Sequence, residues 1–153
     1  KKIDICECLI ESVERNKSYA NGFDVQLELE IPQDGIPVKG DKERLIQVVT
    51  NFISNAVKFS PKGETVTVSV SKNGFFHRVE VIDHGTGIPE GFRDKVFEKF
   101  SQAETGNLRT VQGTGLGLSI SKGIIESHGG TIGFDPKVSV GAKFYFDLPA
   151  TIK

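Results

Sequence analysis

Four polar side chains of the types that bind phosphate and divalent metal ions recur along one predicted helix. Gln47, Asn51 and Asn55 are spaced four residues apart, and Lys58 follows three residues later. Because side chains at i, i+3 and i+4 lie on the same face of a helix, this spacing predicts a row of carboxamides that ends at an ammonium group. Such a row could hold an anion together with its metal ion.

Two glycine-rich turns are further candidates for chemistry. Residues 83–87 read Asp-His-Gly-Thr-Gly, so a carboxylate could accept hydrogen bonds from a flat ligand while the glycines let the backbone approach it. Taken alone, this pentapeptide is better explained as an Asp-initiated turn. Residues 113–117 read Gly-Thr-Gly-Leu-Gly and run into a predicted helix, where free N–H groups favour phosphate. The pattern of a P-loop, a dinucleotide-binding turn or a protein-kinase glycine loop does not occur.

The hydrophobic pattern predicts the elements that must position these residues. Apolar residues at helical spacing predict a helix from Asp41, as its N-cap, to Ser60. Residues 98–113 have no periodicity and are predicted to form a mobile loop of functional length. We expect helices on one face of a mixed, mostly antiparallel sheet, which is an α+β two-layer sandwich. The other expected elements are a strand at 3–5, a helix at 6–22, a strand at 23–31, a hairpin at 66–83, a helix at 116–128, and strands at 131–134 and 142–148.

Composition limits the classes of protein to consider. A chain of 153 residues has room for one domain, and the 37% hydrophobic residues together with the 17 glycines make about 48%, which is normal for a soluble globular protein. A net charge of -1 provides no electrostatic footprint for nucleic acid, and no apolar run approaches the ~20 residues that span a bilayer. Cys6 and Cys8 should point in divergent directions on their helix, so we expect no disulfide or zinc site, but one buried and one partly exposed thiol.

The order of the motifs resembles the ATP-binding catalytic domain of sensor histidine kinases. This domain is related to the gyrase, heat-shock chaperone and mismatch-repair ATPases. Residues 51–60 resemble its N box, residues 83–87 its first glycine box, residues 97–100 its F box and residues 113–118 its second glycine box. The resemblance implies that residues 1–153 form one domain of a larger protein. It also implies the Bergerat ATP-binding fold, with a mobile ATP lid over residues 98–115.

The resemblance also assigns roles to individual side chains. It implies that Asp83 accepts a hydrogen bond from the adenine amino group, so ATP should bind better than GTP. Asn55 matches the Mg²⁺ ligand and Lys58 would meet phosphate, which with Asn51 makes the predicted catalytic set. Hydrolytic relatives carry a glutamate as general base at the position of Asn51. Because a carboxamide cannot accept a proton near neutral pH, we expect slow hydrolysis.

The remaining predicted nucleotide-binding residues lie in or beside the four motifs. Many family members carry Tyr-Arg after the last phenylalanine of the F box, whereas this chain has Ser101 and Gln102. Lys99 or Arg109 could therefore replace the phosphate-sensing arginine, while Phe97 and Phe100 are expected to anchor the lid. The residues expected to complete the binding set are Phe59, Gly85, Gly87, Ile88, Arg109, Gly113, Thr114, Gly115, Leu116 and Gly117.

The resemblance implies a partner that carries the phosphoacceptor. None of the three histidines begins the helical sequence expected of that acceptor. The γ-phosphoryl group of ATP should thus pass to a histidine on a separate dimerisation domain of the same parent, and then indirectly serve a response regulator. We expect a monomeric, cytoplasmic domain that contacts neither nucleic acid nor the membrane, in a parent that could be membrane-anchored. The alternatives are a hydrolytic ATPase and a nucleotide-sensing interaction module without catalysis.

Overall fold

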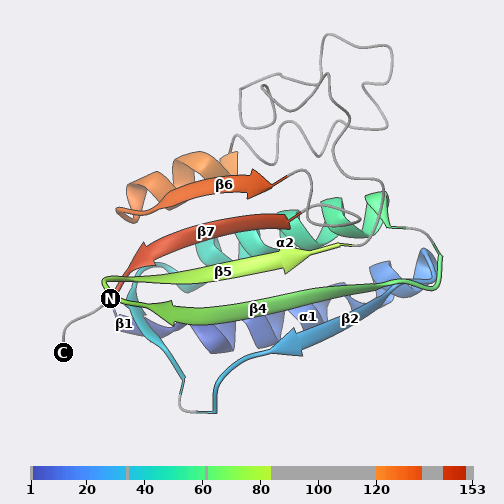
Figure 1. Ribbon diagram of the computed structural model, residues 1–153, viewed down its shortest axis with the longest axis horizontal. Helices are drawn as coiled ribbons and strands as arrows, with labels where there is room; N and C mark the ends of the chain where they lie inside the picture. Colours follow the sequence, from blue (N-terminus) through green and yellow to red (C-terminus); the bar gives the residue numbers. More distant parts are fainter. Residues whose placement is uncertain (1, 34, 61, 84–119, 136–142, 151–153) are drawn as a thin grey trace, which may run out of the picture.

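The computed structural model describes residues 2–33, 35–60, 62–83, 120–135 and 143–150 (Figure 1). These residues form three helices and seven strands. The helices are α1 (Ile5–Gly22), α2 (Lys42–Phe59) and an unlabelled helix over residues 120–127. The strands are β1 (Lys2–Asp4), β2 (Gln26–Glu30), β3 (Pro37–Lys39), β4 (Thr65–Asn73), β5 (Phe76–Ile82), β6 (Thr131–Asp135) and β7 (Lys143–Pro149).

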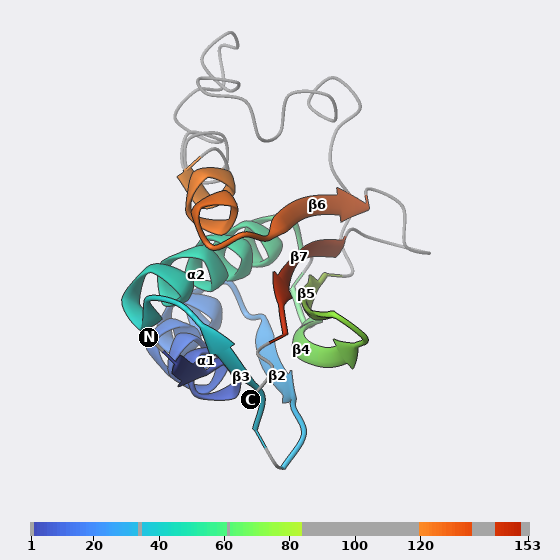
Figure 2. The same ribbon diagram turned by 90° about the vertical axis from the view of Figure 1, so that its left-hand side faces the viewer.

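Five of the strands form one mixed sheet in the order β2-β4-β5-β7-β6. The pair β2 and β4 is parallel, and the other three pairs are antiparallel. The helices cover one face of this sheet, as Figure 2 shows. The expected α+β two-layer sandwich is therefore confirmed. Strands β1 and β3 form a separate antiparallel pair beside the helices.

The core lies between the helical layer and the inward face of the sheet. Alternate residues of β4, Val66, Val68 and Val70, point inward, because successive side chains of a strand face opposite ways. From α2, Phe52 meets Phe144 and Phe146 of β7, with ring centroids 5.4 and 6.0 Å apart. These contacts fix the position of α2 on the sheet.

Helix α2 has the ends that the sequence predicts. The Asp41 side chain accepts hydrogen bonds from the backbone N–H groups of Glu43 and Arg44, at 3.1 and 3.3 Å. This N-cap satisfies donors that have no partner within the helix. At the other end the Ser60 backbone N–H donates to the Val57 carbonyl oxygen. The element that carries the polar row is therefore defined by local sequence.

The strand predicted to begin at Phe23 begins three residues later. The backbone N–H groups of Phe23 and Val25 both donate to the Ala20 carbonyl oxygen, and Asp24 has a φ of 60°. These residues therefore close α1 before β2 starts at Gln26. The alternating hydrophobic pattern extends beyond the strand because Val25 is buried even though it lies just before β2.

Strand β3 was not expected from the sequence. Its formation follows from Asp4, whose side chain accepts hydrogen bonds from the backbone N–H groups of Cys6 and Ile36, both at 2.9 Å. This bridge holds the start of α1 beside the segment that enters β3. Such a contact between residues 32 positions apart leaves no periodic signal in the sequence.

The prediction of one partly exposed thiol is wrong, because both cysteines are buried. Helix α1 is covered on more than one side, by α2 and by strands β2 and β4, so divergent side chains still reach the interior. Burial raises the pKa of the Cys6 thiol to about 11 and that of Cys8 to about 12. Both thiols are free, as expected.

Candidate functional site

The polar row on α2 is a spiral that turns from solvent into the protein. Gln47 and Lys58 are exposed, Asn51 is half-buried, and Asn55 is only 1% exposed. A step of four residues rotates by about 40° beyond a full helical turn, so successive members of the row face different directions. Asn55 is thereby carried to the inner side of α2, whereas Gln47 faces outward. The predicted straight row is wrong in this respect.

Asp83 lies at the same end of the molecule as Asn55. It directly follows β5 and is 1% exposed. Strand β4 starts six residues after α2 ends and runs antiparallel to β5, so the end of β5 returns to the side where α2 ends (Figure 1). Residues 28 positions apart thus supply two buried polar side chains to one end of the two layers.

The helix over residues 120–127 adds a third buried polar group that the sequence did not single out. The carboxamide nitrogen of Asn51 donates a hydrogen bond to the Ser121 hydroxyl, at 3.2 Å, and Ser121 is 0% exposed. A lone serine on a helix gives no sequence signal. Only the packing of two helices, 70 residues apart, makes it visible.

His128 holds the other end of this helix against the start of α2. Its Nε2 accepts a hydrogen bond from the Asp41 backbone N–H at 3.0 Å, and its Nδ1 lies 2.8 Å from the Ile124 carbonyl oxygen. Because a carbonyl only accepts, Nδ1 must donate, and the imidazole is neutral with its proton on Nδ1. These contacts give His128 a structural role between the two helices.

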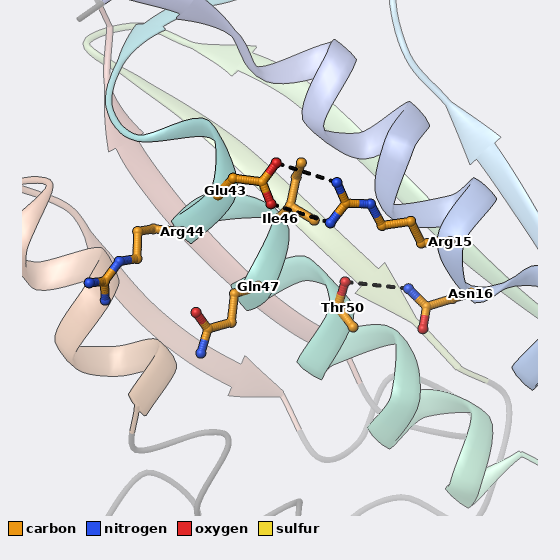
Figure 3. A pocket seen from close by; sticks show the side chains of 7 residues that line it. All are labelled: Arg15, Asn16, Glu43, Arg44, Ile46, Gln47 and Thr50. Carbon is orange, nitrogen blue, oxygen red and sulfur yellow. Dashed lines mark hydrogen bonds and ion pairs between the residues drawn. The ribbon is translucent and has the colours of Figure 1, made fainter.

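Gln47 lies in a groove between α1 and α2. The groove measures about 420 Å³ and is lined by Arg15, Asn16, Glu43, Arg44, Ile46, Gln47 and Thr50. In Figure 3, Arg15 faces Glu43 and Asn16 faces Thr50 across it. These contacts join the two helices, so Gln47 belongs to the outer surface of the helical layer and not to the end that holds Asn55.

Several predicted site residues lie outside the described residues. They are Gly85, Gly87, Ile88, Arg109, Gly113, Thr114, Gly115, Leu116 and Gly117, with the lid predicted over residues 98–115. Phe59 is the last residue of α2. Of the predicted site residues that the structure describes, Asn55 and Asp83 are buried, Asn51 is half-buried, and Lys58 is exposed on the last turn of α2.

The chemistry of these side chains suits a magnesium nucleotide. A buried carboxylate at Asp83 accepts hydrogen bonds from an amino group, and the Asn55 amide oxygen is the kind of ligand that Mg²⁺ prefers. Within the described residues no group of three or more histidine, cysteine or acidic side chains could hold a metal by itself. In the same part of the chain no helix is long and apolar enough to cross a bilayer.

Comparisons with known proteins identify similarity to histidine kinases. Residues 40–152 match the family described as histidine kinase-, DNA gyrase B- and HSP90-like ATPases. The sensor-like histidine kinase SenX3 of Mycobacterium tuberculosis is 32% identical over 151 residues, which cover 99% of this chain and 37% of that protein. This chain therefore spans little more than a third of the length of that relative.

Solved structures show the same similarity. The catalytic domain of histidine kinase ThkA superposes with a TM-score of 0.83 at 28% identity, covering 99% of this chain and 95% of that one. Full-length ShkA in complex with AMPPNP superposes with a TM-score of 0.82 at 29% identity, covering 99% of this chain and 31% of that one.

Proposed function

Because this chain belongs to the family of histidine kinase-, DNA gyrase B- and HSP90-like ATPases, we propose that it is the ATP-binding catalytic domain of a sensor histidine kinase. The proposed reaction transfers the γ-phosphoryl group of Mg-ATP to a histidine on a separate dimerisation domain. The observation that carries the proposal is the burial of Asn55 and Asp83, each 1% exposed, at one end of the sandwich. Burial of two such polar groups is costly unless they have partners, and a nucleotide would supply further ones.

Three of the predicted site residues that the structure describes would bind parts of Mg-ATP. The Asp83 carboxylate would accept a hydrogen bond from the adenine amino group and disfavour a guanine carbonyl at that place. Asn55 would hold Mg²⁺ through its amide oxygen, and Lys58 would meet the phosphates as a point charge. Bound Mg²⁺ would neutralise charge on the phosphates. The chain thereby binds and orients ATP, and phosphoryl transfer depends mostly on such positioning.

Asn51 determines which acceptor receives the phosphoryl group. It occupies the position where hydrolytic relatives carry a general base, and its carboxamide cannot remove a proton from water near neutral pH. Water should therefore be a poor acceptor, and the phosphoryl group would await the histidine of the partner domain. We propose that Arg109 or Lys99, within the lid at residues 98–115, senses the γ-phosphate.

The proposed partner domain belongs to the same parent protein. SenX3 is a sensor-like histidine kinase of which this chain spans 37%, and ShkA, of which it spans 31%, was solved with AMPPNP. Both comparisons support a parent with further domains and an ATP-type ligand for this one. We propose that the domain acts in the cytoplasm, where ATP is available, and that a response regulator receives the signal indirectly.

The deciding experiment mixes the domain, γ-labelled ATP, Mg²⁺ and a dimeric histidine-bearing domain from the same parent. Label on the partner, lost when its histidine is replaced by glutamine, is the expected result. Release of free phosphate without label on the partner would favour the hydrolytic ATPase. Nucleotide binding with neither product would favour a sensing module, and either result would contradict the proposed transfer.

A further inference from the structure

The hydrogen bond between Asn51 and Ser121 joins the proposed catalytic helix to a neighbouring helix. The donor is the Asn51 carboxamide nitrogen, the acceptor is the Ser121 hydroxyl oxygen, and their distance is 3.2 Å. Ser121 is 0% exposed, so its hydroxyl has no access to bulk water. A buried hydroxyl is normally hydrogen-bonded, because an unmade bond there costs free energy. The contact is therefore part of the packed interior.

The place of Ser121 is fixed by the rest of its helix. Seven residues further on, His128 accepts a hydrogen bond from the Asp41 backbone N–H, at the N-cap of α2. The ring also packs on Gly40, where an added Cβ would lie 2.6 Å from the His128 Cδ2 atom. The C-terminal end of the helix over residues 120–127 is thus held at the start of α2 by His128, which restricts how far Ser121 can move with Asn51.

A carboxamide has a donor end and an acceptor end, and one partner can determine which way each faces. The Asn51 carboxamide directs its nitrogen, which is its donor end, to the Ser121 hydroxyl. We infer that Ser121 is a positioning residue, which holds the Asn51 carboxamide in one orientation with its nitrogen toward Ser121. The functional part of this inference rests on the proposed ATP site, whereas the contact itself can be tested without nucleotide.

The first test observes the side-chain amide of Asn51 in the ligand-free domain. Its two N–H resonances, identified by their loss in Asn51→Ala, should shift in Ser121→Ala and exchange faster with solvent. Ser121→Thr keeps the hydroxyl and should retain the wild-type pattern. Ser127→Ala is the matched control, because within the described residues the Ser127 hydroxyl contacts only near neighbours, the Ile124 carbonyl oxygen at 2.7 Å and His128 Nδ1 at 3.5 Å. Unchanged Asn51 resonances in a folded Ser121→Ala protein would overturn the inference.

The second test measures phosphoryl transfer to the partner histidine in a single turnover. Loss of one neutral hydrogen bond should slow Ser121→Ala by roughly 3- to 10-fold. The affinity for ATP should change less than the rate, because Asp83 and Lys58 still hold the nucleotide. In the Asn51→Ala background, Ser121→Ala should have no further effect, because its action passes through Asn51.

The two tests separate failure of the inference from failure of the proposed function. A full additional loss in the Asn51→Ala background would show that Ser121 acts by another route and would overturn its positioning role. If wild-type protein transfers no phosphoryl group, the proposed function fails, while the amide resonances still decide whether Ser121 orients Asn51. Should Ser121→Ala not fold, Ser121→Cys, with a weaker hydrogen-bonding group of similar size, replaces it in both tests.

Discussion

At the scale of single residues, buried polar side chains lie at both ends of β5. Asp83 directly follows the strand and belongs to the proposed nucleotide end, whereas His77 is its second residue. His77 faces inward like Val79 and Val81, and it pairs across the sheet with Lys72. The two polar groups differ in their surroundings, because Asp83 lies at the end proposed to bind the nucleotide and His77 faces inward beside Val79 and Val81.

Replacing Asp83 by asparagine should abolish most of the affinity for ATP. The substitution keeps the size of the side chain but removes the charge that favours an amino donor, and a hydrogen bond to a charged group contributes about 1.5–3 kcal/mol. Asp24→Asn is a matched control, since Asp24 is exposed and its φ of 60° suits asparagine. Titration calorimetry measures the affinity, and tight binding of ATP by Asp83→Asn would contradict the role of Asp83.

Acidification should destabilise the domain through His77. Burial, followed by repulsion from Lys72, lowers the pKa of His77 below its ordinary value of 6.5. The unfolded chain therefore binds a proton near pH 6.5 while the folded protein resists it, and stability falls as the pH drops from 6.5 toward the folded pKa. We expect urea unfolding at pH 7.5 and pH 5.5 to show a smaller loss in His77→Phe than in wild type. Equal losses would exclude His77 as a source of the pH dependence.

At the scale of elements, the turn after the helix over residues 120–127 is closely packed. Gly129 has a φ of +79° and the Gly130 backbone N–H donates to the Ile125 carbonyl oxygen, which ends the helix. A Cβ at Gly130 would lie 2.1 Å from the Asp147 carbonyl oxygen. The backbone at Gly130 therefore approaches β7 more closely than any larger residue allows.

Gly130→Ala should destabilise the domain by about 1–3 kcal/mol, because overpacking forces the backbone of β6 and β7 apart. Gly123→Ala, in the helix that precedes this turn, is the control, since an added Cβ there meets nothing within 4 Å. That change should instead stabilise the domain by about 0.5–1 kcal/mol through helix propensity. Denaturant unfolding measures both, and a neutral Gly130→Ala would show that this turn can relax.

Local sequence signals predicted the elements but not the contacts between them. The N-cap at Asp41, the apolar stripe through Phe52 and the turn at Gly74 are encoded in neighbouring residues, so α2 and the β4–β5 hairpin follow from periodicity and capping. Strand β3 depends on the bridge from Asp4 to Ile36, and the contact of Ser121 with Asn51 joins residues 70 positions apart. Such pairs become apparent only once the layers are packed together.

The candidate site was predictable to a similar degree. Asn55 and Asp83 were identified from their motifs, and both are buried at one end of the sandwich. The rotation of the polar row was missed because side chains four residues apart were treated as a straight line, whereas each step turns by about 40°. Gln47 consequently faces the groove between α1 and α2.

At the scale of the whole molecule, the two faces of the sheet differ in chemistry. The inward face packs against the helices, while the outward face carries ion pairs between β5 and β7. Arg78 binds Asp147 through two hydrogen bonds of 2.8 and 2.9 Å and stacks on the Tyr145 ring, 4.1 Å from its centroid. Lys143 lies 3.2 Å from Glu80. A ligand that joins α2 to the end of β5 would link the two layers and stabilise the whole domain.

Mg-ATP should therefore raise the unfolding temperature of the domain. A ligand present at 100 times its dissociation constant stabilises the folded state by about 2.7 kcal/mol. Addition of EDTA should reduce the shift, because Asn55 would lose its metal ion, and GTP at the same concentration should give a smaller shift than ATP. Thermal unfolding monitored by circular dichroism measures all three. Equal shifts with ATP and GTP would contradict the adenine contact of Asp83.

The positions of the two tyrosines have a practical consequence for spectroscopy. The chain contains two tyrosines and no tryptophan. Tyr19 lies on α1, where its ring packs 5.0 Å from that of Phe23, and Tyr145 lies in the sheet. Each layer therefore carries one intrinsic fluorophore. The Tyr19→Phe protein, which keeps Tyr145, would report the unfolding of the sheet, and the Tyr145→Phe protein, which keeps Tyr19, would report the unfolding of the helical layer, both without an added label.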